Sequence, residues 1–302
     1  MKRILITGVA GFIGSHIARR FLESDYRVIG VDDLSGGQIE NVPKEIEFIQ
    51  GDLSDISLVQ RLPKNCEKIL HLAGQSSGEI SFDDPVADLQ KNTISTLNLI
   101  RYGLENSSER IVYASSMSVY GDVPAIPIEE NHPLAPLSCY GVGKLAAENY
   151  LRVYQAKLPY VSLRMFNVYG PGQNLRNLRQ GMVSIYLAQA LKGGNIEVKG
   201  SLERYRDFIY IDDVVETWFR ATFNKSVLNK ELNVGTGIKT TVDSLLSLIE
   251  TKIPGSSHFV SNPTPGDQSG IFAEIAQLRE LLGREKFISL DEGLDRFIES
   301  IN

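Results

Sequence analysis

Three glycines near the start of the chain, spaced three residues apart, limit its fold more than any other feature. The apolar run at residues 4–6 predicts a short buried parallel strand, and Gly8, Gly11 and Gly14 follow it directly. Apolar residues then recur at helical spacing as far as Leu22. Glycine lets a backbone turn sharply and approach a pyrophosphate, and the N-terminus of a helix offers N–H groups to an anion. The segment therefore predicts a phosphate-binding turn between a strand and a helix.

An acid stands where the second predicted strand, residues 27–31, comes to its end. Asp32 lies at about the 20 residues beyond the glycines at which a ribose-binding carboxylate is expected. A carboxylate accepts hydrogen bonds from a ribose 2′-OH and repels a 2′-phosphate, so Asp32 predicts NAD rather than NADP as the cofactor. Three glycines alone would also suit an ordinary turn. The strand before them, the helix after them and the acid at the end of the next strand favour the dinucleotide site. We interpret Asp33 as a solvated loop acid.

Composition and charge narrow the classes of protein and of partner. The 302 residues are 42% apolar and 23% charged, which suits one large domain or two interlocked ones. A net charge of −6 gives no general attraction to nucleic acid or to an anionic membrane. No stretch reaches the ~18 apolar residues of a membrane span, so we expect a cytoplasmic protein. Cys66 and Cys139 indicate neither a disulfide framework nor a metal site.

Strands alternate with helices over the first half of the chain. Further strands are predicted at residues 46–50, 68–72 and 110–114, with a long helix over residues 85–105. This order predicts an α/β fold: a Rossmann-like, doubly wound parallel sheet. The second half alternates less regularly and predicts a smaller, mixed α/β C-terminal domain for the substrate. Its predicted elements are strands 160–166, 196–199, 207–210 and 232–234 and helices 182–191, 212–222, 242–249, 275–282 and 290–301.

Polar and small residues follow the predicted strands where open α/β sheets bind ligands. Asp52 ends the third strand, and it is interpreted either as a contact to the adenine amino group or as a helix N-cap. The small residues around Gly74 let a ligand pass over the end of the fourth strand. We interpret His71 in that strand as a packed residue and place Asn92 inside the long helix.

A serine-rich strand end and a Tyr-Lys pair point to proton-transfer chemistry. Tyr140 and Lys144 are four residues apart, so a helix would place them on one face. A neighbouring ammonium and an oxidised nicotinamide ring would lower the pKa of Tyr140, which could then remove a hydroxyl proton. Ser116 could hydrogen-bond the same oxygen. Such a pair alone is common on helix surfaces, but the dinucleotide turn favours a catalytic role.

Taken together, these motifs resemble the extended short-chain dehydrogenase/reductase family, in particular its nucleotide-sugar epimerases and dehydratases. The likeness extends over nearly the whole chain. It rests on residues 8–14, 51–53, 71–74, 115–121, 140–144, 163–171, 206–213, 233–237 and 265–267. The cofactor-binding residues that it implies are Gly8, Gly11, Phe12, Ile13, Gly14, Asp32, Asp52, Leu53, Leu72, Ala73, Gly74, Asn92, Tyr140 and Lys144.

The resemblance also implies roles for single residues. Tyr140 would be the catalytic base, Lys144 would hold it and the nicotinamide ribose, and Ser116 would complete the catalytic set. The expected substrate-binding residues are Ser116, Asn167, Arg206 and Asp267. The planar fork of Arg206 suits a diphosphate, although a surface charge at a strand edge is the alternative.

The residues after Ser116 indicate which reaction of the family applies. The 4,6-dehydratases resemble one another in an Asp-Glu pair there, UDP-glucuronate decarboxylases carry a Glu, and the 3,5-epimerases carry a cysteine at the position of Met117. This chain has Met117 and Ser118. The resemblance therefore implies epimerisation of a nucleotide-diphosphate sugar at C4 through a 4-keto intermediate, with UDP-sugars expected. Alternatives are a 2-epimerase, a 4,6-dehydratase, a 4-ketoreductase, and a non-catalytic NAD-sensing regulator.

The chain departs from the family pattern at several positions. Gly143 replaces a serine, Cys139 a proline and Met165 a tyrosine, while Thr264 stands where many relatives have a second phosphate-binding arginine. A non-tyrosine near Ile271 would permit N-acetylated sugars.

We also expect different parts of the chain to bind the cofactor and the substrate. Residues 1–166, with 208–235 returning to them, should bind NAD, and residues 167–207 and 236–302 should bind the sugar nucleotide. The family further implies a homodimer through helices near residues 85–105 and 138–157, although their apolar faces would equally suit a core.

Overall fold

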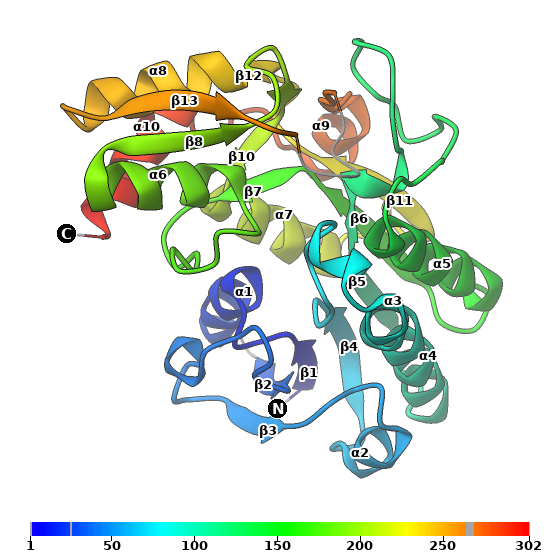
Figure 1. The fold of residues 1–302 in the computed structure, drawn as a ribbon. Coiled ribbons are helices and arrows are strands. Elements are labelled where there is room, and N and C mark those ends of the chain that lie inside the picture. Colours follow the sequence, from blue (N-terminus) through cyan, green and yellow to red (C-terminus); the bar gives the residue numbers. More distant parts are fainter. Residues whose placement is uncertain (1, 25, 264–268, 302) are drawn as a thin grey trace.

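A seven-stranded parallel sheet forms the centre of the molecule (Figure 1). The computed structural model describes residues 2–24, 26–263 and 269–301. The strands lie in the order β11-β6-β5-β4-β1-β2-β3, so the predicted doubly wound sheet is confirmed. They are β1 (Lys2–Thr7), β2 (Tyr26–Asp32), β3 (Glu47–Gln50), β4 (Cys66–His71), β5 (Arg110–Ser116), β6 (Tyr160–Met165) and β11 (Lys230–Val234).

Helices cover both faces of this sheet (Figure 1). In β1, Ile4 and Ile6 pack into the core that holds Trp218, whereas Leu5 between them packs into the core that holds Leu99. This alternation explains why the first strand is apolar without interruption. The helices of one face are α1 (Phe12–Leu22) and α7 (Ile211–Phe223), and those of the other are α2 (Ile56–Arg61), α3 (Pro85–Leu89), α4 (Ser95–Glu105) and α5 (Cys139–Tyr154).

The later part of the chain builds smaller units beside the sheet (Figure 1). Three strand pairs, β10 with β7, β12 with β9 and β13 with β8, carry four helices. The strands are β7 (Asn167–Tyr169), β8 (Asn195–Lys199), β9 (Tyr205–Arg206), β10 (Phe208–Tyr210), β12 (Thr240–Thr241) and β13 (Ser257–Ser261). The helices are α6 (Met182–Gly193), α8 (Val242–Lys252), α9 (Ala276–Leu282) and α10 (Leu290–Glu299).

The structure corrects the predicted elements in three ways. The helix expected over residues 85–105 contains a π-helical turn, η3 (Gln90–Ile94), between α3 and α4. The strand expected over residues 207–210 begins at Phe208, and Asp207 before it is a buried carboxylate that accepts hydrogen bonds from the N–H groups of Thr236, Gly237 and Ala273. Third, the structure adds elements that were not predicted: helix α2 and the short strands β7, β9, β12 and β13. Among the described residues, no helix has the length and apolar character needed to cross a bilayer.

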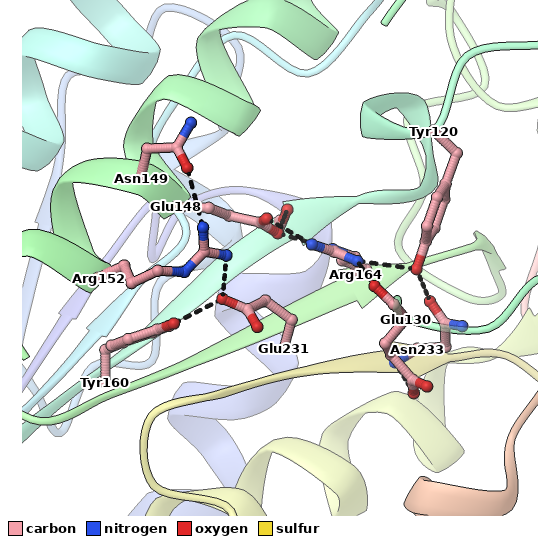
Figure 2. A network of polar contacts seen from close by, with 10 residues as sticks. Tyr120, Glu130, Glu148, Asn149, Arg152, Tyr160, Arg164, Glu231 and Asn233 are labelled. Atoms are coloured by element: carbon pink, nitrogen blue, oxygen red, sulfur yellow. Dashed lines mark hydrogen bonds and ion pairs between the residues drawn. The ribbon is translucent and has the colours of Figure 1, made fainter. Parts of the chain in front are cut away.

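A buried ion pair joins α5 to the sheet (Figure 2). Arg164 in β6 donates from Nε and Nη2 to the two carboxylate oxygens of Glu148, at 3.0 and 2.8 Å, and both side chains are almost fully buried. The same carboxylate accepts a hydrogen bond of 2.6 Å from Ser115. Arg164 also donates to the Tyr120 hydroxyl, which donates to Asn233. Because two parallel hydrogen bonds join the groups, this pair fixes both the distance and the orientation of α5 relative to β6.

We expect Glu148→Ala to lower the free energy of unfolding by about 3–5 kcal/mol, because it leaves the Arg164 guanidinium buried without its partner. Urea denaturation followed by circular dichroism measures the change. Glu105→Ala is the control, since it breaks an exposed pair with Arg101 and should cost under about 1 kcal/mol. Equal losses in the two variants would contradict the importance of the buried pair.

Candidate active site

A cleft of about 1050 Å³ lies at the carboxyl ends of the parallel strands. The strand order reverses between β1 and β4, and ligands of open α/β sheets bind at such a point. Residues of the smaller units, including Asn167 and Gln180, complete its wall. Most of the expected site residues line this cleft: Gly8, Gly11, Phe12, Ile13, Gly14, Asp32, Asp52, Leu53, Leu72, Ala73, Gly74, Ser116, Tyr140, Lys144 and Asn167.

The glycine turn requires residues without a side chain at two positions. Gly8 has a φ of 70°, and a β-carbon there would lie 2.7 Å from the Ala73 nitrogen. A β-carbon on Gly14 would collide with the Gly8 carbonyl oxygen. Helix α1 begins directly after Gly11, and no side chain caps its N-terminus. Because this end of the helix faces the cleft, its first N–H groups are available to a pyrophosphate.

Asp32 joins the end of β2 to the glycine turn. Its Oδ2 accepts a hydrogen bond from Ala10 N–H at 2.9 Å, and its Oδ1 accepts one from Leu34 N–H at 2.8 Å. Burial raises the pKa of this carboxyl, and the two backbone donors oppose that rise. A carboxylate oxygen can accept more than one hydrogen bond, so both oxygens retain capacity for a ribose. The glycine turn and Asp32 thus fit NAD.

Lys91 occupies the rim of the cleft between two acids. It forms ion pairs with Asp33 and with Asp52, the latter at 2.7 Å. The interpretation of Asp33 as a solvated loop acid is therefore wrong. Asp52 is not a helix N-cap either, because Asp55 caps α2 by accepting from Ser57 N–H. Burial raises the pKa of both rim acids, but the contacts with Lys91 and neighbouring serines bring it below its usual value. A contact between Asp52 and adenine stays a prediction.

Tyr140, Lys144 and Ser116 all line the cleft, and their catalytic roles stay a prediction. Tyr140 and Lys144 lie in the first turns of α5, which Ser138 caps by accepting from Gly141 N–H. The Lys144 ammonium lies 5.6 Å from the centroid of the Tyr140 ring. Ser116 ends β5 and accepts a hydrogen bond from Ser118 N–H at 3.1 Å.

The pKa of Tyr140 corrects one expectation. Burial raises it to about 12, and hydrogen bonding to Ser116 opposes the rise. Burial also lowers the pKa of Lys144 to about 8. In the chain without NAD the pKa of Tyr140 is therefore raised and not lowered, because desolvation outweighs the hydrogen bond with Ser116. The positive charge of an oxidised nicotinamide would lower the pKa of Tyr140, and that part of the prediction stays open.

The residues expected to hold the substrate are only partly assembled. Asn167 lines the cleft and donates to the Asp207 carbonyl at 3.3 Å. Arg206 is 4% exposed and donates to the Tyr205 carbonyl, so its interpretation as a surface charge is wrong. Arg206 is not among the residues that line the cleft, and burial lowers its pKa to about 10. Its contact with a diphosphate stays a prediction. Asp267 and Thr264 lie outside the described residues.

Sequence reasoning missed a contact that joins the two walls of the cleft. Arg179, in the segment between β7 and α6, forms ion pairs with Asp83 at 2.7 Å and with Glu79 at 3.0 Å. Beside it, Gln180 donates to the Ser76 hydroxyl at 2.7 Å. No local pattern could have revealed this, because the partners are about a hundred residues apart in the chain.

Two further expected features have clear positions. Asn92 lies in the π-helical turn and is not among the residues that line the cleft; its Nδ2 donates to Asp88 Oδ1 at 3.1 Å. His71 is fully buried between the hydroxyls of Thr7 and Thr96, and burial lowers its pKa to about 3, as befits a packed residue. Within the described part of the chain, no cluster of His, Cys, Asp or Glu is arranged to hold a metal ion.

Replacing Asp32 by asparagine should weaken NAD binding by tenfold or more. The amide nitrogen of asparagine cannot accept a hydrogen bond from a ribose hydroxyl, and a hydrogen bond to a charged group contributes roughly 1.5–3 kcal/mol. Calorimetric titration of the cofactor-free chain with NAD measures the loss. Asp55→Asn should leave the affinity unchanged, because asparagine also serves as an N-cap. An unaltered affinity in the Asp32 variant would contradict the assignment.

Comparisons with known proteins agree with this geometry. The model of the NAD dependent epimerase/dehydratase family matches residues 4–235. A putative UDP-glucose 4-epimerase of Methanocaldococcus jannaschii is 34% identical to the chain, over 98% of it and 97% of its own length. The crystal structure of UDP-glucose 4-epimerase from Thermotoga maritima with UDP-glucose matches with a TM-score of 0.94 and 33% identity, covering 99% of this chain and 98% of that one.

A structure solved with the cofactor gives the same result. The UDP-glucose 4-epimerase of Thermus thermophilus in complex with NAD matches with a TM-score of 0.90 and 34% identity, covering 99% of this chain and 98% of that one. The matched span includes the glycine turn, Asp32, Tyr140 and Lys144. The chain therefore belongs to the NAD-dependent epimerase/dehydratase family, and its cofactor is NAD.

Proposed function

We propose that the protein interconverts UDP-sugars that differ in configuration at C4, with UDP-glucose or UDP-N-acetylglucosamine as the expected substrate. The observation that carries this proposal is that Tyr140, Lys144 and Ser116 line one cleft that fits NAD. Two of the relatives described above are UDP-glucose 4-epimerases of known structure, which supports the same reaction.

The chain's own residues would handle the proton of the sugar 4-hydroxyl. NAD, when bound, supplies the acceptor and later the donor of the C4 hydride. Tyr140 takes the hydroxyl proton as the C4 carbonyl forms and returns it when the carbonyl is reduced. Ser116 hydrogen-bonds the same sugar oxygen. Lys144 stabilises the ionised phenol by its charge.

The residues after Ser116 favour epimerisation over elimination. Met117 is apolar and Ser118 is a weak acid, so neither can protonate a leaving hydroxyl as a carboxyl group would. A 2-epimerase, a 4,6-dehydratase and a 4-ketoreductase are the alternatives, followed by a catalytically silent NAD sensor. Ile271 is fully buried and does not line the cleft, so it lends no support to a choice of N-acetylated sugars.

We extend the proposal to domain roles and to assembly. Residues 1–166 and 208–235 would bind NAD, and residues 167–207 and 236–302 the UDP-sugar.

A homodimer would bury the apolar side chains that α3 and α5 expose. Val86 and Val153 are 64% and 74% exposed, so these side chains do not belong to the core of the single chain. Exposed apolar side chains on adjacent helices are typical of an interface.

Tyr140→Phe should lower kcat by roughly 10²–10⁴-fold, since it removes the hydroxyl that moves the proton, while NAD stays bound. Proton NMR of UDP-glucose, with UDP-N-acetylglucosamine and GDP-, CDP- and dTDP-sugars in parallel, follows product formation. Tyr150→Phe, in an exposed tyrosine of the same helix, is the matched control. Retained epimerisation in Tyr140→Phe would refute the assignment, and net consumption of NADH by the native enzyme would indicate a ketoreductase.

Val153→Glu should convert the protein to a monomer, because it places a charge in the proposed interface. Light scattering coupled to size exclusion measures the mass. Val260→Glu is the control, since this exposed valine lies in β13 on another part of the fold. A monomeric native protein, or a dimeric Val153 variant, would overturn the proposed interface.

A further inference from the structure

We propose that Asp88 is a positioning residue for catalysis, acting as the buried counter-ion that keeps the Lys144 side chain charged beside Tyr140. The inference rests on the proposed function, in which a charged Lys144 stabilises the ionised phenol. Asp88 borders the cleft, and in this proposal it acts through Lys144.

The position of Asp88 is unusual for a carboxylate. It lies in α3, which packs against α5, and only 2% of its surface is exposed. Its Oδ1 accepts a hydrogen bond of 3.1 Å from Asn92 Nδ2, one turn further along the helix. Carboxylates are seldom buried to this degree unless a positive charge or several donors compensate the loss of water.

Gly143 brings the two helices close together beside this carboxylate. A β-carbon on Gly143 would lie 3.3 Å from Asp88 Oδ2 and 3.2 Å from the β-carbon of Asn92. Gly143 directly precedes Lys144 in α5. A larger residue there would have to displace either Asp88 or Asn92, so the bare backbone at this position lets the acid approach the catalytic helix.

Asn92 and Lys144 converge on one point of the cleft wall. A β-carbon on Gly74 would meet Asn92 Oδ1 and would lie 3.5 Å from the Lys144 ammonium. Asn92 Oδ1 has no hydrogen-bond partner among the described residues, although it is buried. The π-helical turn η3 holds Asn92 in this place, and π turns occur often at functional sites. Asp88 and Asn92 are therefore hydrogen-bonded to each other, and Asn92 Oδ1 lies near the Lys144 ammonium.

The charges that act on this group are few. Burial raises the pKa of Asp88, while Asn92 and Lys144 lower it; burial lowers the pKa of Lys144 to about 8, while Asp88 raises it. Burial raises the pKa of the phenols of Tyr140 in α5 and Tyr113 in β5, and the charge of Asp88 adds to both rises. Burial lowers the pKa of His71 in β4, and the charge of Lys144 adds to that fall. Without Asp88, the buried amine would be neutral over more of the physiological pH range. A neutral amine cannot stabilise a phenolate.

The test is the titration of Lys144 in the NAD-bound enzyme with Asp88→Asn. Asparagine keeps the shape of the side chain and can still accept the hydrogen bond from Asn92. In protein labelled with ¹⁵N-lysine, the Lys144 signal is assigned by its loss in Lys144→Met. We expect the pKa of Lys144 to fall by about one pH unit or more in Asp88→Asn. Asp88→Glu, which retains the charge, should titrate closer to the native enzyme.

Asp84→Asn is the matched control. Asp84 is exposed at the start of the same helix, where it accepts from Ala87 N–H, and asparagine caps helices equally well. Its replacement removes the same charge and should leave the Lys144 titration unchanged. A native Lys144 pKa in Asp88→Asn, or equal falls in both variants, would overturn the proposal. Asp88→Ala gives the same readout without placing an amide in the buried site.

A kinetic measurement links this titration to catalysis. In Asp88→Asn, the fall of kcat at alkaline pH should move to lower pH by the same amount as the Lys144 pKa, with KM little changed. If the role of Asp88 were purely structural, its replacement would lower kcat at all pH values and would leave the pH at which kcat falls unchanged. The NMR titration needs no sugar, so inactivity on every sugar nucleotide would overturn the proposed function and still leave the role of Asp88 decided by Lys144.

Discussion

The catalytic helix depends on one buried ion pair for its position. Glu148 lies one turn beyond Lys144 in α5, and both of its carboxylate oxygens are held by Arg164 of β6 (Figure 2). The same carboxylate accepts from Ser115, the neighbour of Ser116. One side chain thus ties the helix that carries Tyr140 and Lys144 to the two strands behind it. A pair of this kind is costly to desolvate, which suggests that accurate placement of α5 is its contribution.

The glycine turn and the juxtaposition of Tyr140 with Lys144 could be predicted from sequence because their geometry is local. Gly14 is needed because a β-carbon there would collide with the Gly8 carbonyl oxygen. Residues four apart in a helix, such as Tyr140 and Lys144, lie on one face. The parallel sheet could be predicted for a similar reason, since strands buried on both faces must be apolar throughout. These features follow from backbone geometry, whatever the rest of the chain does.

The remaining features depend on partners that are distant in sequence. Asp33 and Asp52 are held by Lys91, which comes from a helix about forty to sixty residues later. Arg206 is buried by neighbours that no local pattern identifies, and the pKa of Tyr140 follows from desolvation by the folded chain. In the sequence Asp88 looks like an ordinary helix residue, because nothing in its own segment shows that Gly143 of another helix lies against it.

The ion pairs of Arg179 affect how NAD and the sugar nucleotide enter and leave the cleft. They join the segment after β4 to the segment after β7, and residues of both segments line the cleft. In the proposed epimerisation NAD returns to its starting oxidation state in each cycle, so NAD need not leave between turnovers. The Arg179 ion pairs can therefore persist around bound NAD, and because salt screens such exposed pairs, ionic strength would act on the exchange of NAD more than on the chemical step.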